Sequence, residues 1–311
     1  MIPLKYNHSA ANSHFNDIKG ILIKRIKYVL KNGFTHKPNK YIITSRKEKL
    51  LFKLLEKEEN LRILITSEPG DFKFIIKLFE RFEVKVMEKS NNLNRLLYGV
   101  FTNVYDQMDN WKFIDRIETD TCPYCNRNYI YKLTKNSKIK PEIDHFYPKS
   151  LYPFLGLSFY NLIPSCQTCN GFGAKWALDP LSENMKSPYE INHTDFRFSF
   201  KLKKIDFTSP LDGDSKVLVQ LNTKVPGNNR VFKLSKLYKK HEDHVLELII
   251  KSKAEYSSKY RSYLNSYKGL SFSDNEINRL IVGNYTDLTE LHKRPLSKLY
   301  RDIAKQLNMI E

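Results

Sequence analysis

The four cysteines of this 311-residue chain fall into two Cys-x-x-Cys pairs, Cys122 with Cys125 and Cys166 with Cys169. Two such turns bring four thiolates to one ion, and a closed set of four sulfurs is typical of structural zinc. In a reducing compartment, paired motifs of this kind indicate metal ligands more strongly than disulfides. We therefore predict a structural zinc ion with no position open to water. Four ordinary buried thiols, or a redox-active pair, are the alternatives.

The stretch between and beside these pairs contains residues suited to phosphodiester hydrolysis: Asp144, His145, Asn161 and Asn170. His145 has the pKa range of a general base. Asp144 precedes it in an extended segment and points to the opposite face, where it can bind a divalent cation. Asn170 offers a second oxygen ligand, and the amide oxygen of Asn161 can orient the imidazole.

Three further side chains accompany this group. Glu142 is a possible extra acidic group near the cation, and Lys149 and Lys175 are candidate phosphate contacts. The ordinary interpretation of all three is a solvated surface side chain. An isolated Asp-His pair is likewise usually a surface or capping feature. The order of the residues between two metal-binding turns is what favours a hydrolytic site.

Hydrophobic periodicity predicts the elements that must position these residues. Apolar residues recur at three- and four-residue steps from Phe15 to Val29, which is typical of an amphipathic helix. Other expected helices lie at 50–57, 72–82, 94–113 and 168–176. We expect a hairpin of 128–133 with 139–145 around Asn136-Ser137, and an extended piece at 159–163.

Beyond the cysteines, alternating apolar residues predict a strand at 196–204, which 216–221 can pair. Helical patterns follow Gly227-Asn228-Asn229, and 234–264 forms one long helix or two. Ser273 and Glu276 are spaced as a capping box. Pro295 suits the first turn of a last helix at 295–308.

The chain is strongly basic. It has 52 Lys and Arg against 34 Asp and Glu, a formal charge of +18, and a pI near 9.5. The basic residues gather in 1–50 and 201–240, on both sides of the cysteine region. A polyanion, most often a nucleic acid, is the expected partner, although a lysine-rich composition alone can give such a charge. With 41% hydrophobic residues the chain can bury a core. It shows no signal peptide and no membrane-spanning apolar run, so we expect a cytoplasmic protein.

Residues 120–180 resemble the HNH endonuclease motif, a ββα-metal fold with a four-cysteine zinc clamp, over about a fifth of the chain. The resemblance implies His145 as general base, Asn161 as its orienting residue, and Asp144 and Asn170 as ligands of Mg²⁺ or Mn²⁺. Asn170 stands where many members have histidine, which leaves the preferred metal open.

Two segments, 144–150 and 158–166, are also similar to the HNH subunit of Septu-type antiphage systems and to related retron effectors. Arg294-Pro-Leu-Ser-Lys-Leu is a weaker match to the same subgroup. That resemblance implies a separate ATPase subunit or a retron component as partner, since no GxxxxGK[ST] motif is present here. Oligomeric state is left open.

We therefore predict an α+β protein with a mostly helical region at 1–115, a small ββα-metal core at 116–185, and short strands followed by helices at 186–311. The expected function is metal-dependent cleavage of DNA as an antiphage effector. The alternatives are a zinc-stapled nucleic-acid-binding protein with a degenerate site, and an RNA-cleaving nuclease.

Overall fold

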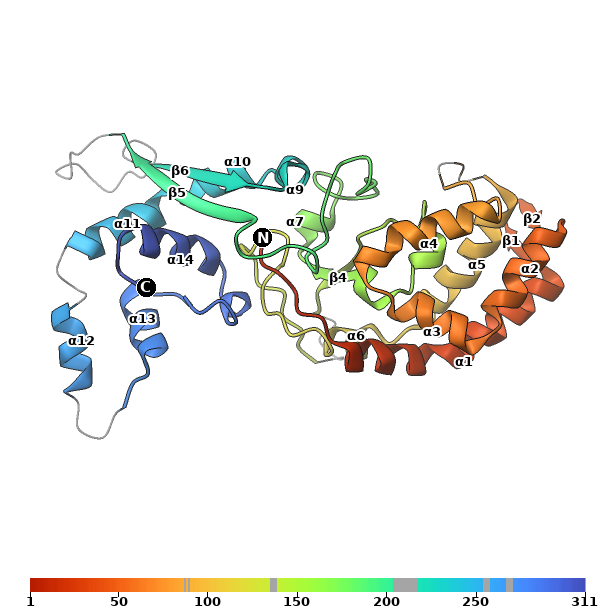
Figure 1. The fold of residues 1–311 in the computed structure, drawn as a ribbon, viewed down its shortest axis with the longest axis horizontal. Helices are drawn as coiled ribbons and strands as arrows, with labels where there is room; N and C mark the ends of the chain where they lie inside the picture. Colours follow the sequence, from red (N-terminus) through yellow and green to blue (C-terminus); the bar gives the residue numbers. More distant parts are fainter. Residues whose placement is uncertain are drawn as a thin grey trace.

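The computed structural model describes residues 1–86, 88, 90–134, 139–203, 217–253, 258–266 and 271–310. The molecule is elongated, with the N-terminal helices at one end and the C-terminal strands and helices at the other (Figure 1). The cysteine region lies between these two ends. Helices dominate, and each sheet contains two antiparallel strands, so the α+β class is confirmed. The turn expected at Asn136-Ser137 lies outside the described residues.

The N-terminal end consists of packed helices, as predicted. The first, α1, buries the periodic apolar face from Phe15 to Val29. The helix expected at 94–113 is two helices, because the Asp109 side chain accepts hydrogen bonds from the backbone N–H groups of Trp111 and Lys112 and starts a new one. The helix α3 and the small hairpin of β1 and β2 were not predicted. The elements are α1 His8–Asn32, β1 Phe34–His36, β2 Asn39–Tyr41, α2 Arg46–Leu55, α3 Glu58–Thr66, α4 Pro69–Arg81, α5 Asn92–Gln107 and α6 Asn110–Ile114.

The middle of the chain forms a short ββα unit: β3 Glu142–His145, β4 Leu162–Ser165 and α7 Gln167–Asn170. The two strands pair antiparallel, with Glu142 opposite Ser165 and His145 opposite Leu162. The predicted pairing of 139–145 with 128–133 is therefore wrong for β3. Its ladder is instead with the later extended segment, which the cysteine pairs bring alongside. Two single turns of 3-10 helix, η2 Pro153–Leu155 and η3 Phe159–Asn161, lie in the connection.

The C-terminal end contains the predicted strand pair, β5 Phe196–Leu202 and β6 Val217–Thr223, with Phe196 opposite Thr223. The pattern from Leu234 is broken into several helices, and the last helix starts at Ser297 because Leu296 has a left-handed backbone. The Ser273–Glu276 capping box is present. The helices are α9 Pro226–Phe232, α10 Leu234–Tyr238, η4 Lys239–His241, α11 Glu242–Lys253, α12 Ser258–Asn265, α13 Asp274–Val282, η5 Leu291–Lys293 and α14 Ser297–Gln306.

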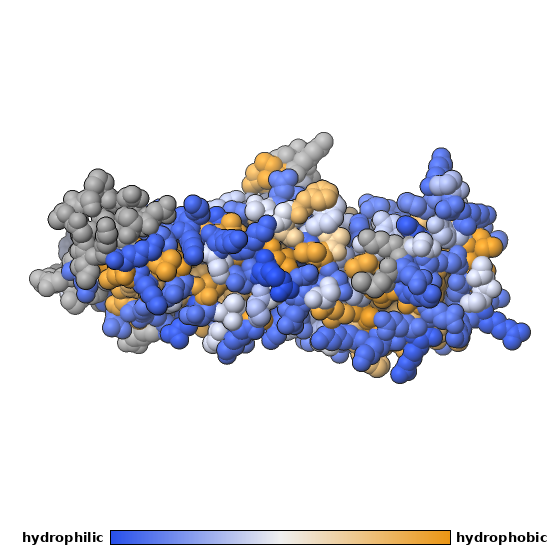
Figure 2. All heavy atoms as spheres, turned by 90° about the horizontal axis from the view of Figure 1, so that it is seen from above, coloured by the Kyte–Doolittle hydropathy of each residue, from blue (hydrophilic) through white to orange (hydrophobic). Residues whose placement is uncertain are grey.

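One cluster of buried hydrophobic side chains runs through all three predicted regions, so their boundaries stay a prediction. Hydrophilic residues cover most of the face in Figure 2, with hydrophobic ones in smaller patches. None of the helices in the described part of the chain combines the length and the apolar character that crossing a bilayer demands.

Two mid-helix glycines give a matched test of the packing at the N-terminal end. Gly20 in α1 is exposed, and an added Cβ would meet nothing within 4 Å, so Gly20→Ala should raise stability by about 0.5–1 kcal/mol. A Cβ at Gly99 in α5 would enter the space of the Phe34 ring, so Gly99→Ala should lower stability by about 1–3 kcal/mol. Denaturant unfolding measures both. Equal effects of the two substitutions would contradict the close packing of Phe34 on α5.

Candidate active site and zinc centre

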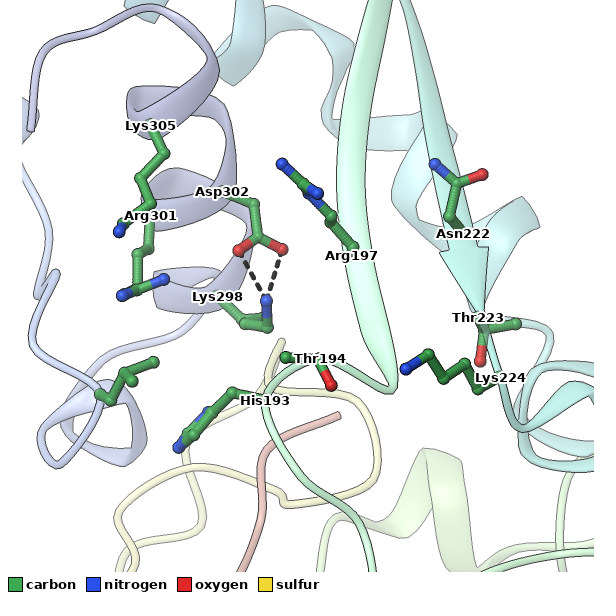
Figure 3. Close-up of a pocket in the computed structure, with 11 residues that line it drawn as sticks. His193, Thr194, Arg197, Asn222, Thr223, Lys224, Lys298, Arg301, Asp302 and Lys305 are labelled. Atoms are coloured by element: carbon green, nitrogen blue, oxygen red, sulfur yellow. Dashed lines mark hydrogen bonds and ion pairs between the residues drawn. The ribbon is translucent and has the colours of Figure 1, made fainter. Parts of the chain in front are cut away.

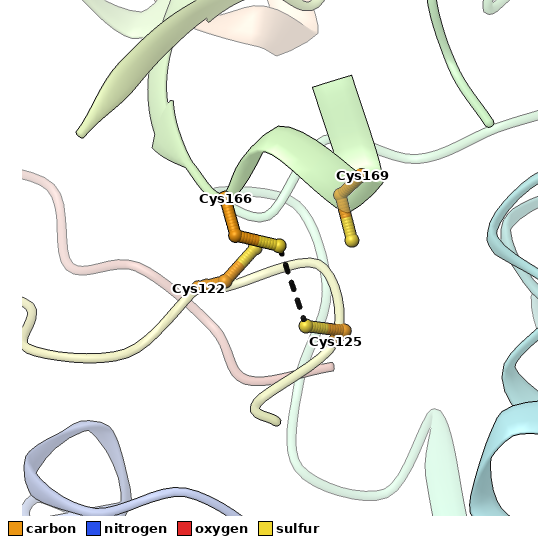
Figure 4. Close-up of side chains that lie close together, drawn as sticks. All are labelled: Cys122, Cys125, Cys166 and Cys169. Carbon is orange, nitrogen blue, oxygen red and sulfur yellow. Dashed lines mark hydrogen bonds between the residues drawn. The ribbon is translucent and has the colours of Figure 1, made fainter. Parts of the chain in front are cut away.

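The four cysteine sulfurs meet in one buried cluster (Figure 4). All four Sγ atoms lie within 4.8 Å of one another, and those of Cys125 and Cys166 are 3.9 Å apart. A tetrahedral zinc ion with Zn–S bonds of ~2.3 Å holds its sulfurs about 3.8 Å apart. The cluster is therefore positioned to bind a metal ion and is compatible with structural zinc.

Backbone and side-chain groups around the cluster point donors at the sulfurs. The Arg127 backbone N–H donates to Cys125 Sγ at 3.4 Å, and the Asn128 amide donates to Cys166 Sγ at 3.3 Å. Hydrogen bonds from Cys122 and the other two thiols, together with that of Asn128, lower the pKa of Cys166. Such donors stabilise thiolate charge, which is the form that binds a metal.

Asn126 connects the first cysteine turn to the C-terminal end of the chain. It is fully buried with a left-handed backbone, φ 50°. Its amide nitrogen donates to the Thr121 hydroxyl at 3.0 Å and to the Leu291 carbonyl at 3.2 Å. Its amide oxygen accepts from the Ser297 hydroxyl and the Lys298 backbone N–H, both at 3.1 Å. The segment containing Arg294-Pro-Leu-Ser-Lys-Leu thus holds the turn of Cys122 and Cys125 in place.

Asp144 is buried on the cysteine side of β3. The Tyr124 hydroxyl donates to its Oδ2 at 2.5 Å, and Lys175 Nζ lies 3.1 Å from its Oδ1. Lys175 Nζ also donates to the His145 carbonyl at 2.7 Å. The exposed fractions of the two side chains are 0% for Lys175 and 3% for Asp144. We expected Lys175 at a substrate phosphate, but here its ammonium neutralises Asp144 instead.

His145 follows Asp144 on the other face of the strand, as the alternation of side chains requires. Its ring is half-buried against the Tyr105 ring, with centroids 4.6 Å apart. Its Nε2 lies 3.1 Å from the Gly156 carbonyl. Because a carbonyl only accepts, Nε2 carries the proton and the lone pair is on Nδ1. Burial, with Lys149 and Lys175 nearby, lowers the pKa of His145 to about 3, so the ring is neutral at physiological pH.

Asn161 holds the loop between the strands and not the imidazole itself. Its amide oxygen accepts from the Tyr147 backbone N–H at 2.7 Å. Its amide nitrogen donates to the carbonyls of Tyr147 at 3.1 Å and Leu155 at 2.9 Å. We expected the Asn161 oxygen at the ring of His145. Instead, Asn161 bonds the carbonyl of Leu155, and the carbonyl of the next residue, Gly156, contacts the His145 ring. Asn161 therefore acts on His145 only through the backbone at 155–156.

Asn170 closes α7 directly after Cys169. Its amide nitrogen donates to Glu142 Oε2 at 2.9 Å, which links α7 to β3. The amide oxygen of Asn170 takes no part in that hydrogen bond. The helix expected at 168–176 ends here, because Gly171 and Gly173 interrupt it. Lys149, the other expected phosphate contact, is half-buried with its Nζ 4.5 Å from the centre of the Tyr105 ring.

The structure adds three groups that sequence reasoning missed: the Tyr124 hydroxyl, the Tyr105 ring and the Gly156 carbonyl. Tyr124 lies inside the first cysteine pair, so its position between two metal ligands was an available signal. Tyr105 lies in α5, far from the motif in sequence, and nothing local marks it. A backbone carbonyl leaves no trace in a sequence.

Comparison with known proteins gives one local similarity. Over 55 residues the chain is 40% identical to the Septu protein PtuB of Bacillus thuringiensis. The matched part is 18% of this chain and 20% of that protein, so the chain covers about a fifth of the relative's length. No protein-family model and no solved structure matches the chain.

Replacing one zinc ligand tests the metal centre. Cys125→Ser should lose the bound zinc and most of the folded protein, because binding free energies at such sites, ~10–16 kcal/mol, match the stability of a whole domain. Elemental analysis and circular dichroism measure the two losses. Ser165→Ala, which removes a buried oxygen beside Cys166 but no ligand, should keep the zinc. Well-folded wild-type protein without zinc would contradict the assignment.

Proposed function

We propose that this protein is a metal-dependent endonuclease of the HNH type, which hydrolyses DNA as the nuclease effector of an antiphage defence system. The observation that carries the proposal is the ββα unit. Asp144 and His145 lie on β3, Asn161 directly precedes β4, and Asn170 ends α7, with the four cysteines clamping both sides. These are the residues that the HNH resemblance assigns to hydrolysis.

The proposed base is His145. A base must be unprotonated and held in one orientation, and the lowered pKa and the Gly156 carbonyl support both conditions. With Nε2 protonated, Nδ1 takes the proton from the attacking water. Tyr105 packs on the ring and limits its rotation. Asn161 is the proposed positioning residue, because it holds the turn that ends at Gly156.

A divalent cation, Mg²⁺ or Mn²⁺, is the proposed catalytic cofactor, and the oxygen donors present suit such a hard ion. Asp144 and Asn170 would hold it, and the Asn170 oxygen is not the atom engaged by Glu142. When bound, the ion would stabilise negative charge on the phosphate and the leaving oxygen. Lys175 already balances Asp144, so occupancy requires its ammonium to give up part of that contact.

Two features support nucleic acid as the substrate. The formal charge is +18, which favours a polyanion. Phe172 and Trp176, in the turn after Asn170, stack on each other at 3.6 Å between centroids. Their exposed fractions are 81% and 52%. Exposed aromatic rings next to a cleavage site can stack on unpaired bases.

The defence role is proposed from the similarity to Septu protein PtuB together with the HNH resemblance. In this proposal the chain acts with a separate ATPase subunit or a retron component. The chain's own sequence contains no GxxxxGK[ST] motif, so nucleotide hydrolysis would come from the partner.

The buried Lys175–Asp144 pair favours one second candidate, a zinc-stapled nucleic-acid-binding protein without hydrolysis. Both oxygens of Asp144 already have partners, from Tyr124 and Lys175. In that candidate Asp144 is a structural residue and the charge of the chain serves binding alone. Cleavage assays on variants separate the two.

The first pair of variants separates chemistry from folding. His145→Ala should fold, keep its zinc, bind DNA, and cleave plasmid in the presence of Mg²⁺ ~10²–10⁴-fold more slowly. Asn161→Ala should instead lose about 2 kcal/mol or more of stability, because three buried backbone groups lose their partners. Plasmid cleavage and thermal unfolding measure the two effects. A folded His145→Ala protein that cleaves at the wild-type rate would leave the binding protein as the better proposal.

The second pair tests the cation ligands. Asn170→Ala removes a partly exposed amide and should fold. Asp144→Asn keeps the shape of the side chain, but an NH2 group replaces one accepting oxygen and the buried Lys175 ammonium loses its countercharge, so its zinc content and melting temperature are measured before cleavage is compared. Both should cleave slowly and recover partly as Mg²⁺ or Mn²⁺ is raised, whereas His145→Ala should not recover. Mg²⁺ should also raise the melting temperature of wild type and not that of Asp144→Asn. Equal cleavage by wild type and both variants at low Mg²⁺ would refute the ligand assignment.

A further inference from the structure

A second site lies at the C-terminal end of the molecule. A cavity of about 580 Å³ opens between the strand pair and α14 (Figure 3). Arg197 on β5, Lys224 after β6, and Arg301 and Lys305 on α14 face it from three elements. None of the residues assigned to hydrolysis lines this cavity. Its size falls in the range of pockets for small ligands, ~300–1,000 Å³.

The single acidic residue among its lining side chains is already neutralised. Lys298 Nζ lies 2.6 Å from Asp302 Oδ1 and 2.5 Å from Oδ2. Asp302 Oδ2 also accepts the backbone N–H of Phe198 at 2.9 Å. Lys298 and Asp302 are both buried. This pair fixes α14 on β5 and contributes no net charge to the cavity.

Four other cations therefore remain. Within the described part of the chain, no ion pair involves Arg197, Lys224, Arg301 or Lys305. The Arg301 Nε donates to the Thr286 carbonyl at 2.8 Å, which holds the guanidinium in place and leaves its terminal nitrogens outside that bond. Like charges gathered around one cavity repel each other, and a bound anion relieves that repulsion.

His193 adds a polar group without a partner to the wall of the cavity. Its Nδ1 is buried and has no hydrogen-bond partner, and the ring lines the cavity. Burial, with Lys298 and Arg301 nearby, lowers the pKa of His193 to about 4, so the ring stays neutral and can donate one hydrogen bond. Because Nδ1 is closed to solvent, a ligand in the cavity would satisfy it only after the His193 side chain turns.

We propose that this cavity binds the phosphate groups of a nucleotide, either a free nucleoside polyphosphate or a nucleotide within a nucleic-acid strand. Arg197, Arg301 and Lys305 hold phosphate oxygens, and His193 can donate to one of them once its side chain turns. The hydroxyl of Thr194 and the amide of Asn222, also in the lining, can contact the sugar or base. This site is independent of the proposed hydrolysis, because its argument uses none of those residues.

The test measures binding to the full-length, zinc-loaded protein without added divalent cation. The probes are a fluorescent nucleoside triphosphate, inorganic triphosphate as competitor, and a labelled 12-nucleotide single strand, read by fluorescence polarisation. The cavity variant is Arg197→Ala/Lys305→Ala, and both residues are exposed. The matched control is Lys201→Ala/Lys240→Ala, which removes the same charge from exposed positions outside the cavity, one of them on the same strand.

The cavity variant should weaken binding of at least one probe roughly tenfold or more, and the control less than about threefold, because lost hydrogen bonds to a charged ligand exceed a general charge effect. Loss of the triphosphate probes identifies a free nucleotide, and loss of the strand alone identifies a nucleic-acid phosphate. Zinc content and melting temperature show whether the variants fold. If the double cavity variant does not fold, Arg197→Gln replaces it. No binding by wild type, or equal losses in both variants, would overturn the proposal.

Discussion

The side chains proposed for hydrolysis lie on, or directly before, two strands of four residues and a helix of four residues. Elements this short are not stable by themselves, because a two-stranded hairpin is marginal and an isolated helix needs ~12–15 residues. The cysteine cluster supplies what they lack. A metal ion held by the four sulfurs would tie the turn at Cys122–Cys125 to the start of α7, next to the strands β3 and β4 that pair in one register. The remaining order in this part of the molecule depends on that constraint.

Buried side-chain amides extend the constraint from the cluster to its surroundings. Asn126 satisfies backbone and hydroxyl groups before and at the start of α14, and Asn161 satisfies backbone groups of the loop between β3 and β4. An amide both donates and accepts, so one residue replaces several backbone hydrogen bonds in a chain that is neither helix nor strand. A buried amide with only part of its hydrogen bonds costs free energy, so the loop is held in the one geometry that satisfies all of them.

The predictions from the sequence were correct where a local pattern of residues determines the structure. Amphipathic spacing located α1 and α4, alternation located β5 and β6, and two Cys-x-x-Cys pairs predicted the cluster. The predictions were wrong where a contact between residues far apart in the sequence determines the structure. The partner of β3 depends on the tether between cysteine pairs, and proximity in sequence favoured 128–133. The burial of Lys175 depends on Asp144 and Phe146 lying across from it, which no periodicity records.

The burial of Asp144 explains why Lys175 and Tyr124 lie against it. A carboxylate without a partner cannot stay ionised in a dry interior, so the buried Asp144 requires an opposite charge and hydrogen-bond donors. Lys175 and Tyr124 provide them, and the Lys175 ammonium is also fixed by the His145 carbonyl. Burial lowers the pKa of His145, and the charges of Lys149 and Lys175 act in the same direction. Lys175 thus contacts the Asp144 carboxylate and the His145 backbone carbonyl at once, so a single buried side chain fixes both neighbouring residues of β3.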